Sequence, residues 1–215
     1  MASVPTPAAR RRRDAVRNSE RIVAAAREVV AEEGLDARMK AIADRAGVGV
    51  GTVYRSIGSR QALLELVLGE AVERSVLAVR AALEEKDAGA AFRGWLLGAA
   101  VPDLDNRAIS VILAARDPDA PIPGAEELER ALSGLLRRAQ DAGAVRDDVA
   151  VTDVFLLFAT LTRVANATAR VGDGGYAARL AALQLEALRP GGAQLPGAPL
   201  SLDELERTLE LLARR

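Results

Sequence analysis

The side chains on which most enzymes depend are largely missing from this chain. Its 215 residues include no cysteine and no histidine. Without cysteine there is no thiolate nucleophile, disulfide or zinc-thiolate cluster, and without histidine the commonest general base and most transition-metal sites are excluded. Carboxylates, lysines, tyrosines and hydroxyls remain, but no carboxylates cluster at metal-binding spacing and no P-loop is present. We therefore expect no enzymatic activity, no metal and no cofactor.

The glycine-rich stretch GVGVG at residues 47–51 superficially suggests a nucleotide-binding loop. A dinucleotide fingerprint needs a third glycine at position 52, which is Thr52, and a strand before the loop, where a helix is predicted instead. The glycines therefore predict a turn followed by a helix start. The missing side chains at Gly49 and Gly51 would also let that helix N-terminus approach a phosphate closely.

The charge of the chain is unevenly distributed. Residues 1–60 hold 12 arginines and lysines against 7 acidic residues, a net charge of +5, while residues 61–215 hold 17 against 23, a net charge of −6. A basic N-terminal part favours nucleic acid as a partner, although a solvated charge excess on a helical surface gives the same count.

Between residues 38 and 61 the spacing of the apolar residues predicts two short helices joined by a turn. Met39, Ile42, Ala43 and Ala46 predict a short helix that stops at Gly47, and a second short helix follows from about Val50 to Arg55. Ile42, Val53 and Ile57 would form the contact between the two helices, and Gly47 allows the positive φ of a sharp turn. This is the pattern of a helix-turn-helix, whose second helix enters the major groove of DNA.

The rest of the chain also indicates helices, because alanine, leucine, valine and arginine dominate and no strand-like alternation is found. A first helix is predicted from Asn18 or Ser19 to Gly34, and a long one of about 25 residues begins after Ser59. Six further helices are expected over residues 88–100, 103–116, 124–142, 150–170, 175–188 and 202–213. The stretch at 190–199, rich in glycine and proline, is expected to be a linker.

We expect three parts in this all-α chain: a disordered basic arm at 1–16 with the run Arg10 to Arg13, a helix-turn-helix domain at 17–60, and a larger helical domain at 61–215. The arginine run is either a solubilising tail or an arm that contacts DNA. No apolar run approaches 18 residues and no secretion signal is found, so we expect a cytoplasmic protein that does not interact with a membrane.

Residues 41–64, AIADRAGVGVGTVYRSIGSRQALL, closely resemble the DNA-binding signature of the TetR family of bacterial regulators, and the likeness runs from about Ser19 to Leu68. Residues 135–165 are similar to later helices of some TetR-type regulators. The resemblance implies three DNA-reading N-terminal helices, followed by a helical domain that dimerises and encloses a pocket for a small-molecule effector.

Carried over by position, the resemblance implies that Tyr54 donates its hydroxyl to a phosphate and that Thr52 touches backbone or a thymine methyl. Arg60 would clamp a phosphate, and Lys40 would meet backbone or a base. Sequence preference would be set by Val50, Arg55 and Ser56, and Gly49 and Gly51 complete the expected interface. Two positions depart from the family pattern: Met39 replaces a frequent threonine, and Ile57 replaces a phenylalanine.

The resemblance also implies a homodimer. The apolar faces of the helices at 150–170 and 175–188 suit an intersubunit four-helix bundle, or otherwise an ordinary core face. Candidates for an effector pocket are Phe92, Trp95 and Phe155, which could equally be core residues, together with Arg163 and Asn166 in a mostly apolar helix; a surface ion pair is the alternative for Arg163.

The sequence thus predicts a double-stranded-DNA-binding transcriptional regulator, acting as a ligand-responsive repressor and a homodimer on a palindromic operator. The alternative is a helical dimeric ligand-binding or interaction protein without a DNA function.

Overall fold

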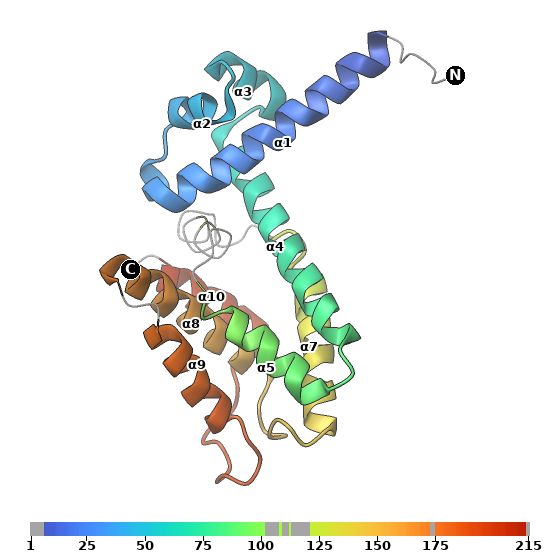
Figure 1. Cartoon of the computed structure of the whole chain (residues 1–215), viewed down its shortest axis with the longest axis vertical. Coiled ribbons are helices and arrows are strands. Elements are labelled where there is room, and N and C mark those ends of the chain that lie inside the picture. The colour runs from blue at the N-terminus through green and yellow to red at the C-terminus, as the bar shows by residue number, and fades with distance from the viewer. Residues whose placement is uncertain (1–6, 102–107, 109–111, 113–120, 173–174, 214–215) are drawn as a thin grey trace.

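The computed structural model describes residues 7–101, 108, 112, 121–172 and 175–213, and over these ranges the chain forms helices and turns without a strand. The all-α prediction is therefore confirmed (Figure 1). The helices are α1 (Pro7–Glu33), the 3₁₀ turn η1 (Gly34–Asp36), α2 (Met39–Ala46), α3 (Val50–Ile57), α4 (Arg60–Glu84), α5 (Ala88–Gly98), α7 (Ala125–Asp141), α8 (Val151–Val171), α9 (Gly175–Ala187) and α10 (Leu202–Ala213).

Helix α1 begins at Pro7, well before the predicted start at Asn18 or Ser19. The prediction of a disordered arm over residues 1–16 is therefore wrong for residues 7–16, which are helical. Proline suits the first turn of a helix, and alanine and arginine rank among the better helix formers. Once the later turns are packed, each added residue forms one more hydrogen bond without a new nucleation step. The helix predicted at 103–116 lies outside the described residues, apart from Ala108 and Ile112.

Helix α4 connects the two ends of the molecule (Figure 1). Ser59 caps it as predicted, because its hydroxyl accepts a hydrogen bond from the Ala62 N–H at 3.0 Å. The first half of α4 supplies four buried residues to the core that α1, α2 and α3 share: Leu63, Leu64, Val67 and Leu68. Ala108 and Ile112 belong to the same cluster. The core of the small domain therefore continues past the domain boundary predicted at residue 60.

The C-terminal domain is a layered assembly of helices around a second core. Helix α7 packs along α4 and α5, and α8 contacts α7, α9 and α10. The largest buried side chains of this core are Phe92, Leu96, Leu132 and Leu135, and Leu161 is buried in a smaller third cluster. The domain is therefore held by α5, α7 and α8, and α9 is packed against α5 and α8 at its surface.

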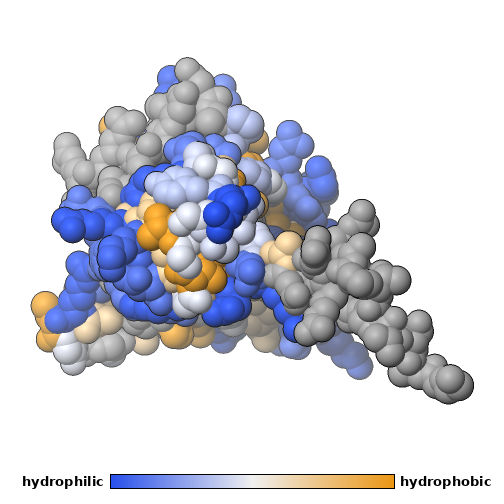
Figure 2. All heavy atoms as spheres, turned by 90° about the horizontal axis from the view of Figure 1, so that it is seen from above, coloured by the Kyte–Doolittle hydropathy of each residue, from blue (hydrophilic) through white to orange (hydrophobic). Residues whose placement is uncertain are grey.

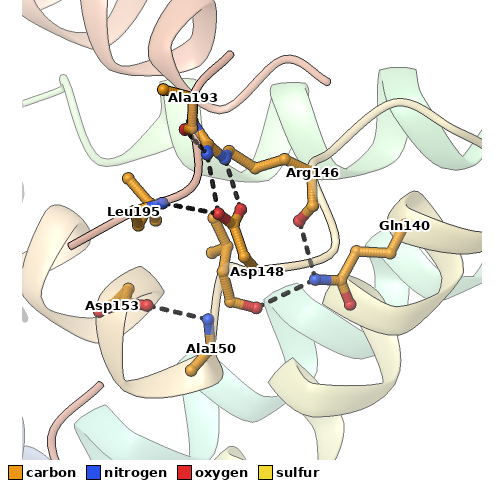
Figure 3. A network of polar contacts seen from close by, with 8 residues as sticks. Gln140, Arg146, Asp148, Ala150, Asp153, Ala193 and Leu195 are labelled. Atoms are coloured by element: carbon orange, nitrogen blue, oxygen red, sulfur yellow. Dashed lines mark hydrogen bonds and ion pairs between the residues drawn. The ribbon is translucent and has the colours of Figure 1, made fainter. Parts of the chain in front are cut away.

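The segment at 190–199 is anchored to the C-terminal domain (Figure 3). The guanidinium of Arg146 donates to both carboxylate oxygens of Asp148, at 2.5 and 2.8 Å, and also to the Ala193 carbonyl. The same carboxylate accepts the Leu195 N–H at 2.9 Å. Bidentate arginine–carboxylate pairs combine charge with fixed geometry. The predicted linker is thus a strap whose backbone is held by hydrogen bonds to both members of this ion pair.

We expect the strap to loosen when Asp148 loses its charge. The Arg146 guanidinium, with help from the Leu195 N–H, lowers the pKa of Asp148 from 3.8 to about 2. A lowered pKa stabilises the folded form above the unfolded pKa, and this contribution is lost as the pH falls through the folded pKa. The hydrogen-exchange protection of the Leu195 amide should therefore persist from neutral pH down to about pH 4 and disappear towards pH 2.

The matched variants are Asp148→Asn and Asp147→Asn, which each remove one carboxylate from neighbouring positions of the same turn. Asp147 is exposed, whereas Asp148 is half-buried. The Asp148 variant should lose protection of the Leu195 amide at neutral pH, and the Asp147 variant should keep it. Equal protection in both variants would mean that the ion pair does not hold the strap.

Candidate nucleic-acid interface

Helices α2 and α3 form the predicted helix-turn-helix. Ile42 on α2 and Val53 on α3 are buried in the common core, and Met39 and Ile57 are partly buried against it. Gly47 caps α2 with a φ of +67°, as predicted for the turn. A Cβ at this position would come within 2.9 Å of the Arg21 guanidinium, which donates to the neighbouring Ala46 carbonyl. The positive φ therefore favours glycine at this turn, whereas the guanidinium at the end of the flexible Arg21 side chain could shift to admit a Cβ.

Helix α2 is also braced against α1 by charge. Arg45 lies between two carboxylates of α1, with contacts of 2.9 Å to Glu28 and 2.8 Å to Glu32. These carboxylates, Glu32 first, raise the pKa of the Arg45 guanidinium above its ordinary value. Arg45 was not among the residues predicted from the sequence, although the four-residue spacing of the two glutamates places them on one face of α1. The brace adds to the buried contacts that hold α2 against α1.

Four predicted contact residues project from the reading helix α3. Tyr54 has 46% of its surface exposed, Arg55 and Ser56 are exposed, and Thr52 is half-buried. Arg55 donates to the Thr52 hydroxyl at 3.2 Å, so these two side chains are already oriented together. The face thus carries a phenol, two hydroxyls and a guanidinium, which are donors suited to phosphate and base edges.

The remaining predicted contact residues differ in their surroundings. Lys40 is exposed on α2 and forms an ion pair with Asp44 at 2.8 Å. Val50 begins α3 and packs partly against the core, and Gly49 and Gly51 are exposed in the first turn of the helix. Arg60 is half-buried, and its guanidinium donates to the Ala37 carbonyl in front of α2. Arg60 therefore joins α4 to the α2 entrance in addition to its predicted role at a phosphate.

The end of the molecule that carries α2 and α3 is mostly hydrophilic, as Figure 2 shows from above. A hydrophobic area lies near the centre of this view and smaller ones lie towards its edges, and hydrophilic side chains make up most of the rest of the described surface. A mostly polar end suits a hydrated, charged partner such as DNA better than an apolar one.

The residues predicted to bind an effector are only partly brought together. Phe92 and Trp95 on α5 have ring centroids 6.2 Å apart, and Trp95 stacks on Phe158 of α8 at 5.0 Å. Phe92 is buried, and Phe155 packs against the same core, so both serve as core residues. Arg163 is half-buried, and the Asn166 side-chain oxygen is buried without a hydrogen-bond partner among the described residues. Sequence reasoning missed Phe158, which follows Phe155 by three residues on the same helix.

A shallow cleft of about 220 Å³ lies between α5, α9 and the turn after α7. Phe92 lines it together with Arg93, Leu97, Ala144, Leu185 and Arg189 among others, whereas Trp95, Phe155, Arg163 and Asn166 do not. Of the five predicted effector residues, only Phe92 therefore lines this cleft.

Helices α8 and α9 present an apolar surface that the subunit itself does not cover. Val171 is 81% exposed at the end of α8, and Tyr176 and Leu183 are exposed on α9. By length and composition α8 is apolar enough to cross a membrane, and only 22% of its most apolar window is buried. Its contacts with α7, α9 and α10, and Arg163 in its second half, are those of a helix packed in a protein.

Comparisons with known proteins agree on one family. The profile of the N-terminal domain of bacterial regulatory proteins of the tetR family matches residues 22–67, and an SbtR-like transcriptional regulator C-terminal domain matches residues 87–190. No match was found among curated proteins.

Among solved structures, a TetR transcriptional regulator of Streptomyces coelicolor is 32% identical, with 81% of this chain and 99% of that chain aligned at a TM-score of 0.60. A TetR regulatory protein of Mycobacterium vanbaalenii is 31% identical, with coverages of 83% and 98% and a TM-score of 0.62. A gamma-butyrolactone receptor shares the fold at 19% identity, with coverages of 93% and 99% and a TM-score of 0.61. With its helix-turn-helix and its helical second domain, the chain belongs to the TetR family of bacterial transcriptional regulators.

Proposed function

We propose that this TetR-family regulator is a ligand-responsive repressor that binds a palindromic operator as a homodimer. The observation that carries the proposal is the two-sided character of α3. Val53 is fully buried in the core, while Tyr54, Arg55 and Ser56 face solvent on a helix that Gly47 and the Arg45 brace hold in place. A polar helix face on a rigid support is what major-groove recognition requires.

Within this proposal the side chains divide into two groups. Thr52, Tyr54 and Lys40 position the protein on the sugar-phosphate backbone, and Arg55 and Ser56 read base edges. We assign Arg60 both to the α2 entrance, through the Ala37 carbonyl, and to a phosphate, because a guanidinium presents five donors in a fixed fork. Gly49 and Gly51 allow the start of α3 to approach the backbone closely, and Val50 reads bases only with the part of its side chain that the core leaves free.

The homodimer would form through α8 and α9. Residues 176 and 183 are seven positions apart and therefore lie on the same side of α9, away from the buried Ala177 and Ala181. A second copy would cover this apolar surface and the exposed part of α8, as in an intersubunit four-helix bundle. The two reading helices would then face successive major grooves, about 34 Å apart.

The effector would act by favouring a dimer whose reading helices have the wrong spacing. The factor by which DNA affinity falls is set by the ratio of the effector's affinities for the two conformations, and it is typically about 5- to 150-fold. Helix α4 would transmit the change, because its two halves belong to the DNA-binding core and to the C-terminal domain. We place the effector near the stack of Phe92, Trp95 and Phe158, where the unpartnered Asn166 oxygen lies on the same helix as Phe158.

Selection of bound duplexes from a random DNA pool tests the proposal directly. We expect enrichment of one palindrome whose half-site centres are about one helical turn, or a multiple of it, apart. If a correctly folded dimer selected no preferred sequence from the pool, operator recognition would be contradicted. The enriched duplex is the operator in the experiments below.

A further inference from the structure

The first turns of α1 carry a concentration of positive charge that the helix-turn-helix does not use. Residues 7–21 contain six arginines and two acidic residues, a net charge of +4, and four of the arginines are consecutive at 10–13. All of them lie in one continuous helix with the buried residues that begin at Ile22. The arginine run is therefore attached to the DNA-binding core by a helical rod.

This rod extends beyond the small domain. Arg13 and Arg10 precede the core residue Ile22 by nine and twelve positions, which corresponds to about 14 and 18 Å along the helix axis. In Figure 1 the N-terminal end of α1 projects past α3, at the end of the molecule opposite α5, α7 and α9. The run is thus held far from the C-terminal domain, whose acidic residues would be its alternative partner within the chain.

The charge at this end is unfavourable for an isolated helix. The N-terminus of a helix carries a partial positive charge, which disfavours nearby cations, and the first turn of α1 has no acidic residue to offset it. Four adjacent arginines also repel one another. A partner that neutralises them all must present several anionic groups along its surface.

We propose that the arginine run binds DNA phosphates that flank the half-site read by α3. Duplex DNA has one negative charge for about every 1.7 Å of its axis, which is the density that four clustered guanidinium groups can use. The helix axis carries the run past α3, about 14 to 18 Å from Ile22, which corresponds to roughly four to five phosphates along one strand. The inference rests on the proposed function, and it adds a second contact surface that is independent of base sequence.

The test compares full-length proteins on two duplexes. One duplex is the operator trimmed to its two half-sites, and the other extends it by about ten base pairs, one helical turn, on each side. The first variant replaces Arg10, Arg11, Arg12 and Arg13 with alanine, which keeps helix propensity, and the second replaces them with lysine, which keeps the charge. A control removes the same charge from exposed positions of the C-terminal domain: Lys86→Ala, Arg93→Ala, Arg130→Ala and Arg137→Ala.

We expect the alanine variant to bind the extended operator at least about tenfold more weakly at 0.1 M salt, because two or more phosphate contacts are lost. The slope of log K against log salt should become shallower by about 0.9 for each lost contact. On the trimmed operator the alanine variant should match the wild type. The lysine variant and the C-terminal control should keep the wild-type slope on both duplexes.

An unchanged slope for the alanine variant on the extended duplex would overturn the proposal. An equal loss on both duplexes would also overturn it, because the run would then act within the half-sites. Circular dichroism and the mass of the dimer establish that each variant is folded. If no operator is enriched, the same slopes on a mixed-sequence duplex still test the arginine run, so its failure is distinguishable from failure of operator recognition.

Discussion

The double variant Thr52→Val, Tyr54→Phe should lose operator affinity by about a hundredfold or more while the protein stays folded and dimeric. Each substitution removes one hydroxyl and leaves the shape of the side chain nearly unchanged. A hydrogen bond to a charged group contributes about 1.5–3 kcal/mol, or roughly 10- to 150-fold in an equilibrium constant. Each subunit of the dimer loses two such hydrogen bonds. The loss of operator affinity is therefore large even if water molecules replace part of the lost hydrogen bonding.

Fluorescence anisotropy with the selected operator measures this effect, and a matched variant controls it. Ser133→Ala with Thr208→Val removes two hydroxyls from α7 and α10, where we propose neither a DNA contact nor a dimer contact. The control should bind like the wild type. Wild-type affinity in the α3 variant would show that neither hydroxyl contacts DNA and would leave only Arg55 and Ser56 on the face of α3.

Arg60 is left out of this test because its guanidinium also serves the fold. It donates to the Ala37 carbonyl, which lies at the entrance to α2. Replacing Arg60 would therefore disturb the position of α2 together with the proposed phosphate contact. The family resemblance predicts the phosphate contact, and only the tertiary structure shows the contact with a carbonyl 23 residues away.

The helix-turn-helix could be predicted because its signals are local. Gly47 marks the end of α2 through its own backbone conformation, and Ser59 marks the start of α4 through a hydrogen bond three residues away. The apolar residues that predict α2 and α3 follow one another at intervals of about one helical turn. Each of these features involves residues close in sequence, so each is visible before the fold is known.

The N-terminal arm and the effector residues could not be predicted in the same way. The composition of residues 1–16 suggests disorder, but residues 7–16 continue a helix whose packed part begins at Ile22. The effector candidates were chosen because aromatic residues are scarce in the chain. Their grouping depends on how α5 meets α8, and this angle brings Phe158, not Phe155, onto Trp95.

The dimer interface can be tested at one leucine whose surroundings in the subunit are known. Leu183 is 59% exposed on α9, on the same side as Tyr176. Leu183→Glu should therefore leave the subunit folded, because the carboxylate faces water in the monomer. In the proposed dimer it would be buried in an apolar interface without a partner, which is strongly unfavourable for a charge. We expect sedimentation to show monomers at concentrations where the wild type is dimeric.

Loss of the dimer should also lower the affinity for the operator. Two linked reading helices gain about 10²- to 10⁴-fold over a single one, because the second half-site is bound at a high effective concentration. The Leu183 variant should therefore lose about that much operator affinity but keep its affinity for an isolated half-site.

Leu77→Glu, at 55% exposure on α4, introduces the same charge outside the proposed interface and should change neither property. A Leu183 variant that remains dimeric would place the interface elsewhere. The exposed surface of α8 and α9 would then need another partner. A Leu183 variant that is monomeric but binds the operator at full strength would instead separate dimerisation from DNA recognition, and the palindrome would have to be read by independent subunits.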